Sequence, residues 1–159
     1  MFIYSMRASS VKFFSVIVLT LAVLVGLVVF GKGGSDAVYA SSADVDFSGI
    51  KTDEDRVRFI TQFGIKVDDE PTETEEFRVP ENFDRVIAGY NEIQKKQGLN
   101  IEKYKNKKVT RYTYEIEDYE YGGKKVDAVV NLVIYKNTVV ACDISSASPD
   151  GFVLPLISL

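Results

Sequence analysis

Basic and aromatic side chains alternate in one stretch of the sequence, and this pattern could bind an anionic polymer. The five cationic residues of the stretch are Lys103, Lys105, Lys107, Lys108 and Arg111. Tyr104, Tyr112 and Tyr114 lie between or beside them, so cations and rings would share one surface. Such a surface attracts a cell-wall polymer or lipid head groups. The alternative, which we favour, is a solvated loop that enters a strand whose tyrosines pack inward.

Carboxylates suggest two further chemistries. Calcium could bind the run Asp68, Asp69, Glu70, Glu73, Glu75 and Glu76. The run lacks the glycine and the ligand spacing of a calcium loop, so a solubilising turn is the preferred interpretation. Asp143 with Glu115 or Glu117 could form a pair for glycoside hydrolysis. A domain of this size offers little room for a sugar cleft, so we give this pair little weight.

The scarcity of histidine and cysteine excludes several kinds of site. The sequence contains no histidine and a single cysteine, Cys142. Serine–histidine–aspartate and cysteine–histidine catalysis are therefore excluded, as are histidine-containing zinc sites and an intramolecular disulfide. Cys142 follows the apolar residues Val139, Val140 and Ala141, which predicts a packed thiol. We expect no catalytic residue, no metal site and no cofactor.

The overall charge argues against nucleic acid as a partner. The chain has a formal net charge of -4, and the acidic residues concentrate after residue 43. Nucleic-acid affinity comes largely from neutralising phosphates, which an acidic domain does poorly. We therefore expect partners of another kind.

An apolar segment near the N-terminus predicts a membrane anchor. Residues 13–30 carry no charge and are bracketed by Lys12 and Lys32. As a helix they would span roughly 27 Å, close to the thickness of the bilayer hydrocarbon. The basic residues before the segment place residues 1–12 in the cytoplasm and the rest of the chain outside. The alternative is a signal peptide cleaved after Ala40, in which case the domain is secreted.

The remainder divides into a linker and one domain. Residues 31–51 are rich in small and polar side chains and predict a flexible linker. The folded domain is expected over residues 52–159. Thr52 and Asp55 have the spacing of a helix N-cap and its acidic N3 residue, and Gly64 can end that helix.

A second helix is predicted by apolar residues at spacings of three and four. These residues are Phe83, Val86, Ile87, Tyr90 and Ile93. Pro80 introduces the helix and Gly98 is the expected stop. Two short extended segments, residues 65–67 and 76–79, are expected between the two helices.

From Val109 onward the pattern alternates, which indicates β-strands. Gly122-Gly123 and Lys136-Asn137 are signals for tight hairpin turns. They separate an initial strand from strands over residues 126–135 and 138–144. The predicted fold class is α+β: a small antiparallel meander packed against two helices on one of its faces, preceded by the transmembrane helix.

Three stretches of the chain resemble an uncharacterised family of small membrane-anchored bacterial proteins, domain of unknown function 4830. They are residues 59–60 with 63–67, residues 79–84 with 90–98, and residues 103–114. Two departures occur: residues 119–123 replace an Asn-Tyr-Pro-Gly-like turn, and residues 141–143 replace a Gly-Gly-Asp run. The resemblance implies a fold and an extracytoplasmic address, and it implies no activity.

These observations favour a non-enzymatic binding or interaction module of the cell envelope. Its partners would be the membrane, through residues 13–30, and an envelope protein or anionic polymer. Two alternatives stay open: an enzyme acting on cell-wall polymers through carboxylates, and a regulator linked to a membrane partner. Two buried acids in a cleft would favour the enzyme, whereas a flat apolar patch or an open sheet edge would favour the binding module.

Overall fold

The computed structural model describes residues 45–146 and 151–157. The predicted anchor at residues 13–30, the predicted cytoplasmic residues 1–12 and most of the predicted linker lie outside these described residues. Within the described ranges, no helix is both long enough and apolar enough to cross a membrane.

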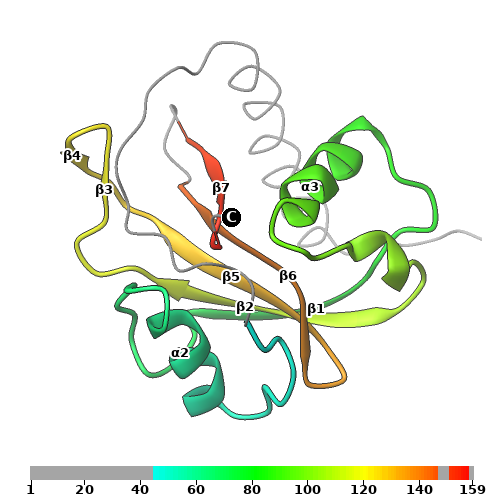
Figure 1. Cartoon of the computed structure of the whole chain (residues 1–159), viewed down its shortest axis with the longest axis horizontal. Helices are drawn as coiled ribbons and strands as arrows, with labels where there is room; N and C mark the ends of the chain where they lie inside the picture. Colours follow the sequence, from blue (N-terminus) through cyan, green and yellow to red (C-terminus); the bar gives the residue numbers. More distant parts are fainter. Residues whose placement is uncertain (1–44, 147–150, 158–159) are drawn as a thin grey trace, which may run out of the picture.

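A five-stranded antiparallel sheet forms the centre of the domain, in the order β1-β2-β5-β6-β7 (Figure 1). Its strands are β1 (Glu73–Arg78), β2 (Lys108–Glu115), β5 (Val129–Tyr135), β6 (Thr138–Ser145) and β7 (Val153–Pro155). The short strands β3 (Glu120–Tyr121) and β4 (Lys124–Lys125) form a separate hairpin between β2 and β5. The predicted antiparallel meander is therefore confirmed, and the structure adds β7.

Both predicted hairpin turns lie where the sequence placed them. Gly122 and Gly123 have φ angles of 62° and 75°, and Lys136 and Asn137 have φ angles of 47° and 64°. Consecutive positive φ angles give the turn the twist of the flanking strands. Glycine adopts this backbone freely, whereas Lys136 is held in it by the β5–β6 ladder on either side.

The two predicted helices are confirmed, the first with its predicted N-cap, while the second begins at Arg85 rather than directly after Pro80. α2 (Asp53–Thr61) begins at Thr52, whose side chain accepts from the Asp55 N–H while the Asp55 side chain accepts from the Thr52 N–H. This capping box satisfies two backbone donors at the start of the helix. α3 (Arg85–Lys95) begins at Asp84, whose carboxylate accepts from two backbone N–H groups of the first turn.

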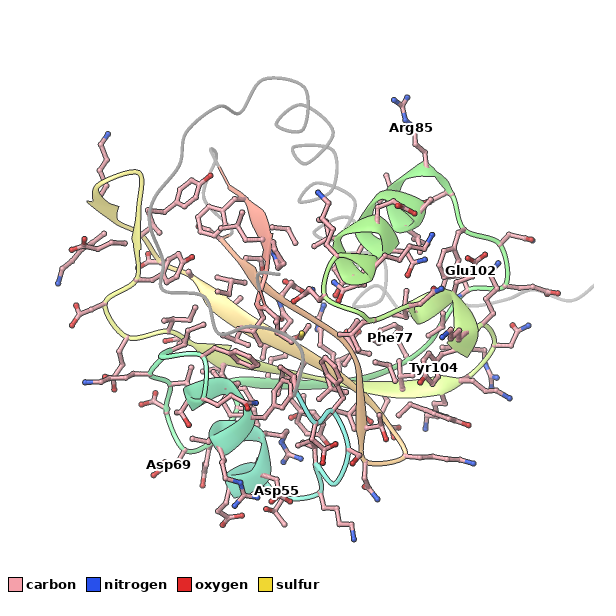
Figure 2. All side chains as sticks on the ribbon, in the orientation of Figure 1. Asp55, Asp69, Phe77, Arg85, Glu102 and Tyr104 are labelled. Atoms are coloured by element: carbon pink, nitrogen blue, oxygen red, sulfur yellow. The ribbon has the colours of Figure 1, made fainter. Side chains whose placement is uncertain are left out.

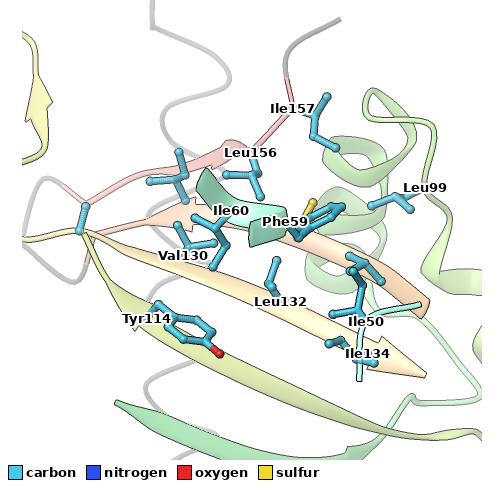
Figure 3. Close-up of a cluster of buried hydrophobic side chains, with 14 of the residues drawn as sticks. Ile50, Phe59, Ile60, Leu99, Tyr114, Val130, Leu132, Ile134, Leu156 and Ile157 are labelled. Atoms are coloured by element: carbon cyan, nitrogen blue, oxygen red, sulfur yellow. The ribbon is translucent and has the colours of Figure 1, made fainter. Parts of the chain in front are cut away.

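The helices do not lie on one face of the sheet, contrary to the expectation from the sequence. Phe59 and Ile60 of α2 pack in a cluster with Leu132 of β5 (Figure 3). Full burial of one such apolar side chain stabilises the folded state by about 1.5–3 kcal/mol relative to leaving it exposed. Tyr90 of α3 instead packs against a separate cluster of buried apolar side chains, which contains Val133 of β5. Leu132 and Val133 project to opposite faces because side chains alternate along a strand.

α3 also differs from its predicted packing. Its deeply buried side chains are the polar Asn91 and Gln94, which are 3% and 0% exposed, whereas the predicted apolar residue Ile93 is only half-buried. The reason is position: α3 lies beside β6, where main-chain groups of the strand require hydrogen-bond partners.

Ordered packing begins before residue 52. Ile50 is 8% exposed and belongs to the cluster that contains Phe59 and Ile60 of α2, and Phe47 packs against the same cluster. The Ile50 N–H donates to the Asn137 carbonyl, and the Val139 N–H donates to the Phe47 carbonyl. The last residues of the predicted linker are thus fastened to the turn between β5 and β6.

Candidate functional site

The five basic residues of the predicted polyanion surface do not share one face. Lys103 belongs to the short 3-10 helix η2 (Ile101–Tyr104), and Lys105 and Lys107 belong to the turn that follows it. Lys108 and Arg111 lie on β2 at odd spacing. Side chains alternate along a strand, so these two project to opposite faces of the sheet.

Three of these cations pair with carboxylates. Lys105 contacts Glu102 at 2.8 Å, and its ammonium lies 4.9 Å from the Phe83 ring centroid. Lys108 contacts Glu76 of β1 at 2.5 Å. Exposed ion pairs of this kind contribute at most about 1 kcal/mol to the stability of the fold.

Arg111 forms the third of these pairs, with Glu75 of β1 at 3.2 Å. The arginine side chain is 18% exposed and the glutamate side chain is 29% exposed. Burial raises the pKa of Glu75, while the charge of Arg111 opposes that rise. The pair ties β1 to β2 on the face opposite α2.

The carboxylate run divides between a loop and a strand. Asp68, Asp69 and Glu70 are exposed in the loop before β1, and Asp69 points away from the domain (Figure 2). The other three carboxylates lie on β1. Within residues 45–146 and 151–157, no group of three histidine, cysteine, aspartate or glutamate side chains is placed to hold a metal ion.

Asp143 is the most deeply buried of the three carboxylates considered for hydrolysis. It is 4% exposed, and its oxygens accept hydrogen bonds from Tyr90 at 2.8 Å and from Asn131 at 2.9 Å. Asn131 in turn accepts from the Thr113 hydroxyl at 2.9 Å. These bonds connect α3, β6, β5 and β2, so the network fastens the helix to the sheet.

Burial explains the protonation behaviour of this network. Removal from water raises the pKa of Asp143, and the hydrogen bonds from Asn131 and Tyr90 oppose that rise. Removal from water also raises the pKa of Tyr90 well above its usual value, and the nearby Asp143 adds to this effect. Glu115 and Glu117, proposed as partners of Asp143, are exposed. The geometry assigns Asp143 a structural bond rather than a paired catalytic role.

A glutamine pair at the end of α3 completes the edge of β6. Gln94 Oε1 accepts from the Cys142 N–H at 2.9 Å, and Gln97 Nε2 donates to the Cys142 carbonyl at 2.9 Å. Gln97 Oε1 accepts from the Ile157 N–H at 2.9 Å. The two amides take the place of a neighbouring strand at this point of β6. Neither glutamine was singled out by the sequence, since the strand they serve lies 45 residues or more away.

Cys142 is buried, as the sequence predicted, and it lies in the cluster that contains Phe59 and Ile60 of α2. Cys142 is 0% exposed, and burial raises the pKa of its thiol well above the usual value. A reactive cysteine requires an exposed, electropositive environment. This thiol has the environment of a packing group.

A hollow of about 350 Å³ lies between α3 and η2. Among its lining residues, Lys95 pairs with Glu92 and Lys105 pairs with Glu102. The side-chain oxygen of the buried Asn91, in the wall of the hollow, accepts a hydrogen bond from the Ile101 N–H at 2.9 Å. Both lysines that line the hollow are thus paired with carboxylates that also line it.

Among residues 45–146 and 151–157, the outer side of β1 is an open sheet edge. Thr72 donates to the Thr113 carbonyl and Val79 donates to the Lys107 carbonyl, so odd-numbered residues of β2 bond toward β1. The partners of these residues within β1 are Glu73, Glu75 and Phe77. The alternate residues Thr74, Glu76 and Arg78 therefore direct their N–H and C=O groups away from β2.

In the described part of the chain, no strand pairs with this side of β1, which stands at the end of the strand order. The edge ends at a bulge, where Val79 faces both Asn106, with a φ of 63°, and Lys107. Unpaired main-chain groups on an edge strand are a template for another strand. Charged side chains on β1 restrict which strands can approach it.

A family model described as Domain of unknown function (DUF4830) matches residues 59–144. The match runs from within α2 to within β6 and so covers more than half of the chain, including all of β1. Neither the curated proteins nor the solved structures contain a match to this sequence.

Proposed function

This chain belongs to the DUF4830 family, and from that premise we propose that it is a membrane-tethered, extracytoplasmic domain that binds a partner polypeptide of the cell envelope along the open edge of β1. The description of the family carries no activity, so the function is argued from the geometry of the chain.

The open edge of β1 is the observation that carries this proposal. A partner strand would bond to the main chain of Thr74, Glu76 and Arg78, which supplies affinity, and would meet their side chains, which supply selectivity. The buried acid Asp143, the main feature that could support an enzyme, is committed to Tyr90 and Asn131. A binding role uses the groups that the fold leaves open.

The sequence supports the address. Residues 13–30 have the length and composition of a membrane-spanning helix, and the basic residues before them favour an outside location for the domain. A reporter that is active only outside the cytoplasm, fused after Leu159, is expected to give signal. A folded fusion that stays silent would contradict this topology.

Crosslinking in the native membrane tests the binding role. A photoreactive amino acid replaces Thr74 in the full-length chain, and crosslinked polypeptides are identified. Glu76→Pro removes an N–H that points away from β2, so the β1–β2 ladder stays intact while the outer edge loses a donor. We expect Glu76→Pro to abolish the crosslink, and thermal unfolding checks that the variant is folded.

The matched control is Glu76→Gln, which removes the charge and keeps the N–H. We expect it to retain the crosslink, because the main chain supplies most of the contact. Arg78→Pro is a second variant at the next outward position, should Glu76→Pro fail to fold. Crosslinks that persist unchanged in a folded proline variant would rule out the β1 edge as the binding site.

A further inference from the structure

We propose that the polypeptide paired with the β1 edge is β1 of a second copy of this chain, in an antiparallel arrangement around a two-fold axis at Phe77. This proposal rests on the proposed function, because it names the partner of the same edge. The resulting dimer joins two five-stranded sheets into one continuous sheet.

The geometry of the edge restricts how two copies can pair. Only Thr74, Glu76 and Arg78 offer main-chain groups on the outer side, so hydrogen-bonded pairs must join even-numbered residues. In a two-fold antiparallel pair, the axis then passes through one residue of β1. The residue on the axis defines the register of the pair.

Charge selects one register. An axis at Thr74 places Glu73 opposite Glu75 of the second copy, an axis at Glu75 or at Glu76 places that carboxylate against its own copy, and an axis at Arg78 places two guanidinium groups together. Like charges directly opposite one another destabilise a sheet. An axis at Phe77 instead places Glu76 opposite Arg78 of the second copy, and the two-fold repeats this pairing.

The remaining pairs of this register are also compatible. Phe77 is half-buried and packs against the cluster on the face opposite α2, so at the axis the two rings would meet on that face. Aromatic pairs across strands stabilise a sheet. Glu75 would lie opposite Val79 of the second copy, so this pair brings no like charges together.

Tethering favours such a pairing. A short edge strand supplies few hydrogen bonds, and in free solution these would hold two copies weakly. Anchoring both chains through residues 13–30 confines them to one surface and raises their effective concentration. The edge can then be charged enough to reject other strands and still pair with its own copy.

Cysteine crosslinking of the full-length chain in its membrane tests the register. Phe77 would face its own copy in a non-hydrogen-bonded pair, the position at which opposite Cβ atoms approach closely enough for a disulfide. We expect Phe77→Cys to form a disulfide-linked dimer on mild oxidation. The control is Glu75→Cys, which has no matching cysteine opposite it and should stay monomeric. The native Cys142 is 0% exposed and contributes no background.

Charge exchange provides a second readout that needs no new cysteine. Glu76→Arg and Arg78→Glu each place like charges opposite one another and should reduce the dimer, measured by crosslinking in the membrane, about tenfold or more. The double variant Glu76→Arg with Arg78→Glu restores opposite charges and should restore the dimer. A double variant that stays as weak as the single ones would overturn the register.

The outcome separates this inference from the proposed function. An edge-dependent crosslink to a different polypeptide, with no dimer formed by Phe77→Cys, would overturn self-pairing and leave β1 as the binding edge. A Glu75→Cys dimer that forms as readily as the Phe77→Cys dimer would also overturn it. Loss of every edge-dependent crosslink would remove both proposals.

Discussion

At the scale of single residues, Asp143 is the group whose surroundings most change its chemistry. Sequence reasoning found it only as one of several carboxylates, because its partners Tyr90 and Asn131 are 53 and 12 residues away in the chain. The packed state of Cys142 could be predicted, since its apolar neighbours lie beside it in the sequence. Local context predicts local burial, whereas a network between strands depends on the register of the sheet.

A dependence of stability on pH follows from Asp143. Burial raises the pKa of this acid in the folded state, so the folded state holds the proton more tightly than the unfolded state does. The stability from this residue is therefore fully present below its unfolded pKa of about 3.9. It is lost as the pH rises through the higher folded pKa.

Asp143→Asn tests this dependence, because asparagine cannot titrate. We expect the free energy of unfolding of the native protein, minus that of the variant, to fall as the pH rises through this window, measured by urea unfolding at several pH values. Taking the difference cancels the acids with lowered pKa values, such as Asp55 and Asp118, whose effect has the opposite sign. A difference that is flat or that rises with pH would contradict the assignment.

At the scale of elements, the sequence predicted those features whose signals are local. The capping box at Thr52, a helix between Pro80 and Gly98 and both hairpin turns are each encoded by residues close together in the chain. β7 was missed because three residues carry too little periodicity to identify a strand. The placement of α3 was also missed, since its buried face is made of amides that resemble a solvated surface in the sequence.

Gln97→Leu tests whether the glutamine pair holds α3 to the edge of β6. The substitution leaves the Cys142 carbonyl and the Ile157 N–H, both now bonded to Gln97, without these partners. Each buried polar group left unsatisfied costs about 1–3 kcal/mol. We expect a loss of about 2 kcal/mol or more in the free energy of unfolding, measured in urea.

The matched control for this prediction is Lys96→Leu, which adds the same side chain at the exposed neighbouring position. We expect the control to change stability by less than about 0.5 kcal/mol. Equal effects of the two substitutions would show that the glutamine amide is dispensable.

At the scale of the whole molecule, the proposed function rests on the outer edge of β1, with which no other described strand pairs. The sequence indicated a stretch of cations as a candidate site, yet the fold places Lys108 and Arg111 on opposite faces of β2 and pairs both with acids of β1. The edge of β1 could not be predicted, because the strand order that leaves it open is set by long-range pairing. The two halves of the proposed function therefore have different origins: the address comes from the sequence and the binding edge from the fold.

Residue-resolved amide hydrogen exchange tests the central claim most directly. The full-length chain is compared in its native membrane and after transfer, at high dilution, into detergent. We expect the outward N–H groups of Thr74, Glu76 and Arg78 to be protected in the membrane and to exchange rapidly in detergent, while the N–H groups of Glu75 and Phe77, which face β2, stay protected in both. Rapid exchange of the three outward N–H groups in the membrane would contradict a partner strand on β1.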